Sequence, residues 1–158
     1  MENNTSVLVA ELKKLLNGGS AHVGLKAAVA DLPFKLLGEK PAGLPYSIWQ
    51  LVDHIRIAQW DMLEFSRDAT HQSPKWPDEY WPKALAPQDE QTWIAALAQI
   101  ESDKEAFIQL LESADLYAEI EHGDGQSILR EALQIADHNA YHIAEIVVIR
   151  RLLGAWKS

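Results

Sequence analysis

The stretch SIWQLVDHIRIAQWDMLEFSR, residues 47–67, decides the fold because it joins a helix start to a long apolar repeat. Ser47 is a typical N-cap residue, since its side chain can accept a hydrogen bond from a free N–H group of the first helical turn. After it, apolar residues recur every three or four positions, the spacing that gathers side chains on one face of a helix. The pattern predicts a core helix that begins at Ser47 and ends near Arg67. The repeat comprises Ile48, Leu51, Val52, Ile55, Ala58, Met62 and Phe65.

Three other stretches have helical periodicity, and none has the strict alternation of an exposed-face strand. The first covers residues 6–32 and is broken by the glycine pair at 18–19. A third helix is expected over residues 88–113, and a fourth over residues 126–153. A chain of 158 residues has the size of one domain with one core. We therefore predict an all-α fold, an antiparallel four-helix bundle that occupies residues 1–158 as a single domain.

The predicted last helix is apolar on nearly all of its sides. Such a helix is either the most buried one of a bundle or also faces a second subunit. Ile143, Val147 and Val148 could form that interface, or they could be buried within one bundle. A homodimer is therefore one of two expectations for this helix.

The net charge argues against a nucleic-acid partner. The chain has 23 acidic and 14 basic residues, a formal charge of -9. The mean electrostatic field of such a protein repels phosphate backbones and anionic lipid headgroups. The densest basic pairs, Lys13-Lys14 and Arg150-Arg151, do not form a basic stripe interleaved with aromatic residues. We expect no nucleic acid among the partners.

Cysteine is absent, which excludes disulfides, thiolate metal ligands and a cysteine nucleophile within this chain. Any thiol chemistry would need a supplied cosubstrate. Residues 1–5 lack the basic start and the apolar run of a signal peptide. The most apolar stretch, residues 143–153, is interrupted by Glu145, Arg150 and Arg151, so we expect no membrane span. A cytoplasmic location is the resulting expectation.

Two histidines of the predicted last helix are the first candidates for chemistry. His138 and His142 stand four residues apart, so their side chains project from one helix face and can reach one metal ion. Such pairs also occur as exposed residues or as hydrogen-bond donors to carbonyl groups. His54 adds a third imidazole on the inward face of the core helix. Three inward histidines from two helices match the way in which bundle cores hold metal ions, so we predict that these three bind one divalent ion.

Two carboxylates lie near the predicted ligands. Asp61 and Glu145 stand about two turns from His54 and His138 on their helix faces. Such residues can orient a bound water, transfer a proton or fix the tautomer of an imidazole ring. We predict catalytic roles for both. A solvated or salt-bridged surface carboxylate is the alternative.

The remaining histidines are weaker candidates, and the sequence leaves the role of His22, after the glycine break, open. His71 and His122 lie in predicted loops, where solvation is the expected state.

The connection between the second and third helices is long for a compact bundle, and a loop of this length is uncommon unless it covers part of the molecule. Its tryptophans, Trp76 and Trp81, are flanked by prolines and could form a wall or lid over a metal cavity.

The chain resembles the DinB-like superfamily of four-helix metalloproteins, which includes the YfiT-like proteins and thiol-dependent S-transferases. The likeness rests on SIWQLVDH at 47–54, RIAQWD at 56–61 and DHNAYH at 137–142, with the broken first helix. It implies DinB-like topology, with nickel or zinc held by His54, His138 and His142. In some relatives the ion lowers the pKa of a low-molecular-weight thiol and binds it as thiolate.

These observations lead to two hypotheses about function. The first is a metal-dependent enzyme for a small-molecule substrate, a thiol-dependent S-transferase or a hydrolase, with Glu145 or Asp61 assisting proton transfer. The alternative is a non-catalytic small-molecule-binding or stress-response protein in which the histidine cluster is structural. An apolar pocket without an open metal position would favour the alternative.

Overall fold

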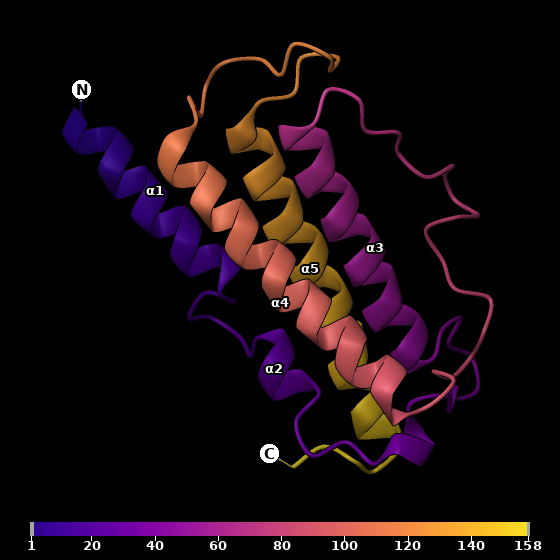
Figure 1. The fold of residues 1–158 in the computed structure, drawn as a ribbon. Helices are drawn as coiled ribbons and strands as arrows, with labels where there is room; N and C mark the ends of the chain where they lie inside the picture. The colour runs from indigo at the N-terminus through magenta and orange to yellow at the C-terminus, as the bar shows by residue number, and fades with distance from the viewer. Residues whose placement is uncertain (1, 158) are drawn as a thin grey trace.

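The fold of the computed structural model is built from helices alone within its described part, residues 2–157 (Figure 1). Four long helices lie lengthwise against one another, and two short helical turns follow the first of them. The all-α prediction is therefore confirmed. The elements are α1 (Glu2–Leu16), α2 (Leu25–Ala28), the 3-10 turn η1 (Phe34–Leu36), α3 (Ile48–Arg67), α4 (Glu90–Ser113) and α5 (Ile128–Leu152).

Helix directions in the bundle are mixed. Trp49 packs against Trp93, and the Gln59 side chain donates to the Ile100 carbonyl oxygen, so α3 and α4 run in the same direction. Helix α5 runs opposite to both (Figure 1). The reason is the connection over residues 68–89, which returns along the whole length of α3 before α4 begins. The bundle thus differs from a fully antiparallel one in its α3–α4 pair.

Local sequence signals fix the helix starts. The Ser47 side chain accepts a hydrogen bond from the Gln50 N–H, and the Gln50 side chain accepts one from the Ser47 N–H, which together form a capping box. Asp89 and Ser127 cap α4 and α5 through a single bond each, accepting from the Thr92 and Arg130 N–H groups without the reciprocal bond of a capping box. The predicted bounds of these three helices agree with the structure to within two residues.

The first helix is longer and its continuation shorter than predicted. Helix α1 already includes Glu2, and it ends before Gly18 and Gly19, whose φ values of 98° and 62° suit residues without a Cβ atom. After this break only the single turn of α2 is helical. The helix does not resume before the loop, because Asp31 has a φ of 53°, outside the helical region, and Pro33 disfavours a helix through itself and the residue before it.

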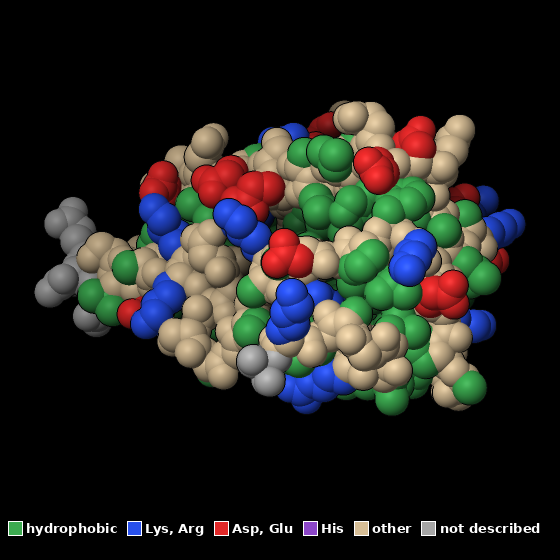
Figure 2. Space-filling view, turned by 90° about the horizontal axis from the view of Figure 1, so that it is seen from below, with side chains coloured by type: hydrophobic (Ala, Val, Ile, Leu, Met, Phe, Trp, Pro, Cys, Tyr) green, Lys and Arg blue, Asp and Glu red, His purple; other side chains and the backbone are tan. Residues whose placement is uncertain are grey.

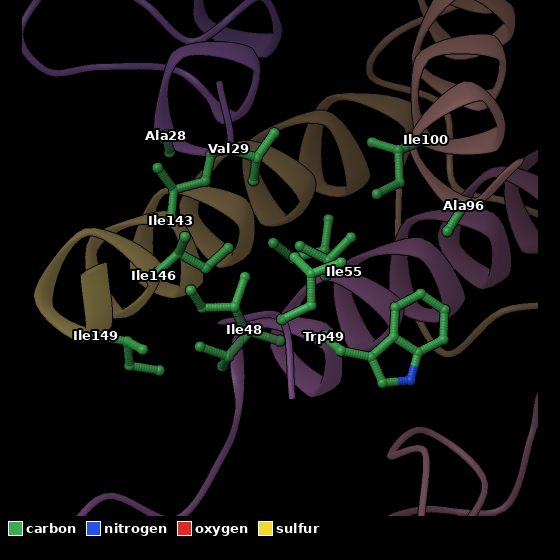
Figure 3. Close-up of a cluster of buried hydrophobic side chains, with 13 residues drawn as sticks. Ala28, Val29, Ile48, Trp49, Ile55, Ala96, Ile100, Ile143, Ile146 and Ile149 are labelled. Carbon is green, nitrogen blue, oxygen red and sulfur yellow. The ribbon is translucent and has the colours of Figure 1, made fainter. Parts of the chain in front are cut away.

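The core surrounds α3. Ile48, Trp49 and Ile55 of α3 point toward side chains of α2, α4 and α5 (Figure 3). A second cluster, around Leu63 and Phe107, joins α1 to the far end of the bundle. Helix α3 buries thirteen residues and α5 nine, so the first of the two alternatives for the last helix, that it is the most buried one, is wrong. The apolar pattern of α5 does not mean complete burial, because several of its apolar side chains lie outside the contact with α3 and are exposed.

The surface has both charge signs. Figure 2 shows the face below the view of Figure 1, where basic and acidic side chains are interspersed among hydrophobic ones. No continuous basic area covers this face. Among the described residues, no helix has the length and apolarity needed to cross a membrane.

Candidate metal site

Three histidines meet between α3 and α5. His54, His138 and His142 each offer a ring nitrogen, and these nitrogens lie within 4.8 Å of one another. His54 and His142 are buried, and His138 is half-buried. His54 Nε2 and His138 Nε2 are 3.0 Å apart. The predicted convergence of the three imidazoles is therefore present.

A polar bridge sets the register of the helices beside the site. Gln59 is 1% exposed, and its side chain both donates to the Ile100 carbonyl and accepts from Asn139 Nδ2 at 2.8 Å. The bridge links α3, α4 and α5 one residue from His138. Buried amides are held firmly when all of their groups are bonded, so this bridge fixes α5 relative to α3.

Oxygen acceptors occupy the Nδ1 side of each ring. His54 Nδ1 lies 2.8 Å from the Tyr80 carbonyl oxygen, and His142 Nδ1 lies 2.7 Å from Glu145 Oε2. His138 Nδ1 faces Asn139 Oδ1 at 3.3 Å. Because these oxygens can only accept, the Nδ1 atoms donate and the Nε2 lone pairs remain free. All three rings are thus held in the tautomer that metal-binding histidines use.

Burial keeps two of the rings uncharged at neutral pH. Desolvation lowers the pKa of His54 from 6.5 to about 4, and the neighbouring His138 and His142 add to this effect against the Tyr80 hydrogen bond. The pKa of His138 also falls to about 4, mainly through burial and then through His142. A neutral imidazole is the form that binds a metal ion.

Aromatic rings from the long connection cover His54. The Trp81 ring stacks on the His54 ring with centroids 3.7 Å apart, and Tyr46 stacks on the other face of Trp81 at 3.9 Å. Trp76 and Trp81 both line the cavity next to the histidines, so the predicted wall is confirmed. The connection over residues 68–89 therefore covers the histidine cluster.

A cavity of about 430 Å³ lies beside the three histidines. Its volume is within the range of small-molecule sites, about 300–1,000 Å³. Carboxylates, aromatic rings and the apolar side chains of Ala58 and Met62 share its wall. The lining residues are His54, Ala58, Asp61, Met62, Trp76, Tyr80, Trp81, Glu131, Gln134, His138 and His142.

Comparison with protein families agrees with this geometry. A family model of the DinB superfamily matches residues 22–146, most of the chain and all three histidines. The chain belongs to the DinB superfamily. Comparison with curated proteins and with solved structures finds no match for this DinB superfamily protein.

The donor set of this DinB superfamily protein fits a divalent metal ion. Two nitrogens bound to one ion at about 2.0–2.1 Å lie roughly 2.8–3.4 Å apart for right or tetrahedral angles, and the His54–His138 separation of 3.0 Å agrees. Two free lone pairs at this distance repel each other unless a proton or a metal cation lies between them. Imidazole ligands suit zinc, nickel, copper and iron.

The two predicted carboxylates have different surroundings. Glu145 is bonded to His142 on the Nδ1 side of that ring, opposite the nitrogen that remains free. Asp61 lines the cavity, and its carboxylate accepts hydrogen bonds from His71 Nε2 at 2.7 Å and from the Tyr80 hydroxyl. Asp61 thus faces the cavity, whereas Glu145 holds the His142 ring from its Nδ1 side.

Three residues that lie at the site were not predicted as site residues from the sequence. The expectation of a solvated His71 is wrong, because its side chain is 9% exposed and paired with Asp61. Tyr80 and Glu131 line the cavity. Only the aromatic content of the connection and the shared helix face of Glu131 hinted at them. His22 is exposed and bonds the Val23 carbonyl, away from this DinB site.

His122 is exposed too, but it is not merely solvated. Its Nε2 atom lies 2.7 Å from the Phe65 carbonyl oxygen, and its ring packs against the Phe65 ring. The contact joins the loop before α5 to the end of α3.

Proposed function

We propose that this DinB superfamily protein is a divalent-metal-dependent enzyme, a transferase or hydrolase, acting on a small molecule. His54, His138 and His142 would hold nickel or zinc. The observation that supports this most is that three free Nε2 lone pairs meet at the wall of a cavity rather than inside a closed core. Structural metal sites are closed, whereas catalytic sites keep a position open. The cavity therefore favours the enzyme over the structural histidine cluster.

Each residue has a separate proposed role. When bound, the ion supplies positive charge that polarises a substrate and lowers the pKa of a neighbouring water or thiol. Tyr80, through its carbonyl, and Glu145 orient His54 and His142. The Asp61 carboxylate, held by His71 and the Tyr80 hydroxyl, accepts the proton that the attacking group loses.

A low-molecular-weight thiol is the proposed cosubstrate of the transferase reaction. The chain has no cysteine, so it carries no thiol of its own to compete for the ion. A thiol is also a soft ligand that suits nickel and zinc. In the hydrolase version of the proposal, water takes its place.

Metal analysis tests the proposed site. Protein purified without a histidine tag is expected to contain about one equivalent of nickel or zinc, and His138→Ala is expected to lose it. Glu145→Ala should weaken metal affinity by about tenfold to a hundredfold, because it frees the Nδ1 side of His142. His22→Ala, an exposed histidine on a loop, is the matched control and should retain the metal. A metal-free protein whose stability is unchanged by His138→Ala would refute the proposal.

A thiol titration separates the enzyme from a structural cluster. In cobalt-loaded protein, 2-mercaptoethanol is expected to give a sulfur-to-metal charge-transfer absorption, since an open position accepts the sulfur. Serine of equal concentration serves as the thiol-free control. A cobalt spectrum that 2-mercaptoethanol leaves unchanged would mean a closed site and would favour the non-catalytic binding or stress-response protein.

A further inference from the structure

Glu131 is a buried carboxylate that has no partner. It lies on the first turn of α5, and 7% of its surface is exposed. Within the described residues its side chain makes no hydrogen bond or ion pair, yet it lines the cavity of the histidine cluster. The group of nitrogens within 4.8 Å of one another does not include its oxygens, so Glu131 is not part of the metal cluster.

A carboxylate in this position is costly for the fold. Burial of an ionised group without a compensating donor is unfavourable. Burial also raises the pKa of Glu131, and of the charges near it Arg130 opposes the rise while Asp61 adds to it. Each oxygen of Asp61 already accepts one hydrogen bond, whereas the described residues donate none to Glu131. A ligand with a donor group would remove this cost.

The remaining wall of the cavity also suits a cation. The Trp76 and Tyr80 rings lie 5.4 Å apart at an angle of 60°, and Trp76 is 71% exposed at the edge of the cavity. The faces of such rings attract positive charge. Among the described lining residues there is no lysine or arginine that would neutralise the two carboxylates.

We propose that the substrate carries a protonated amine that binds the Glu131 carboxylate beside the rings of Trp76 and Tyr80. The proposal rests on the proposed metal-dependent function for the reacting end of the substrate. Glu131 precedes His138 by seven residues, which is about 10 Å along the axis of α5. The amine therefore lies about two helical turns from the metal ligands, on the same side of the cavity as Asp61, and serves to position the substrate.

Two probes of equal shape test the charge preference. 2-Phenylethylamine is protonated at pH 7, and 2-phenylethanol is its neutral counterpart. Their binding to zinc-loaded protein is followed by the fluorescence of the cavity tryptophans. We expect the amine to bind at least about tenfold more tightly, in line with a cation–π contact plus a charge-assisted hydrogen bond to a carboxylate. Equal affinity for the two probes would overturn the proposal.

Variants identify the residue responsible. Glu131→Gln, which keeps the shape, is expected to reduce the preference to less than about twofold, and Trp76→Leu to weaken amine binding. Glu105→Gln, an exposed glutamate on α4, is the matched control and should leave the preference unchanged. A preference for the amine that survives Glu131→Gln would reject Glu131 as the partner of the amine.

Melting temperatures show whether a loss of amine binding in Glu131→Gln comes from a folding defect. The amine should raise the melting temperature of the wild-type protein and not that of Glu131→Gln, whereas an equal rise in both would count against the proposal. Metal content is measured in the same samples. Failure of the proposed metal site would appear as missing zinc, and failure of the amine site as missing charge preference with zinc in place.

Discussion

At the scale of the residue, the site depends on imidazoles that are kept neutral by burial. His54 and His138 have folded pKa values of about 4, against an ordinary value of 6.5. His54 and the paired histidines could be predicted because helical spacing alone gathers them on inward faces. His71 and Tyr80 could not, since their partner Asp61 lies on another element and the path of a loop is not encoded in local spacing.

The lowered pKa values predict how pH affects the metal-free protein. Between pH 6.5 and 4, His54 and His138 are protonated in the unfolded chain but remain neutral in the folded chain. The free energy of unfolding therefore has its full value above pH 6.5 and decreases as the pH falls below it. Urea unfolding of chelator-treated protein at pH 7 and pH 5 measures this loss. His138→Gln removes one of the two groups and should lose less stability over the same interval. An equal loss in variant and wild type would contradict the assignment.

At the scale of the element, α3 organises the molecule because it contacts both α4 and α5 and carries His54. Its start could be predicted from Ser47, its apolar repeat and the helix-stopping residues around it, which are all local signals. The direction of α4 relative to α3 could not. It depends on the connection over residues 68–89, whose Trp81 and Tyr80 pack on side chains of distant sequence.

Ser47 ties the start of α3 to this connection. Its hydroxyl accepts from the Gln50 N–H and donates to the Leu85 carbonyl oxygen at 2.6 Å. We predict that Ser47→Ala lowers the free energy of unfolding by about 1–2 kcal/mol, because a cap and a buried bond are lost together. Urea denaturation checks the value. Ser102→Ala, exposed on α4, is the control and should cost nothing; an equally stable Ser47→Ala would show that the cap is unimportant.

At the scale of the whole molecule, we propose that residues 1–158 act as one domain and that α5 also forms a homodimer. Ile143 is buried within the chain's own bundle, which excludes it from an interface, whereas Val148 and Tyr141 are 46% and 66% exposed on the same helix. Light scattering is expected to give twice the 17.7 kDa of one chain, and Val148→Asp to give the monomer. A monomeric wild-type protein at all concentrations would contradict this prediction.

The central claim is that one ion binds the three free Nε2 atoms, and anomalous diffraction at the nickel and zinc edges tests it most directly. The prediction is a single anomalous peak about 2.0–2.1 Å from the Nε2 atoms of His54, His138 and His142, next to the cavity. A crystal grown with nickel or zinc that has no peak there, or has peaks only at exposed histidines such as His22, would contradict it.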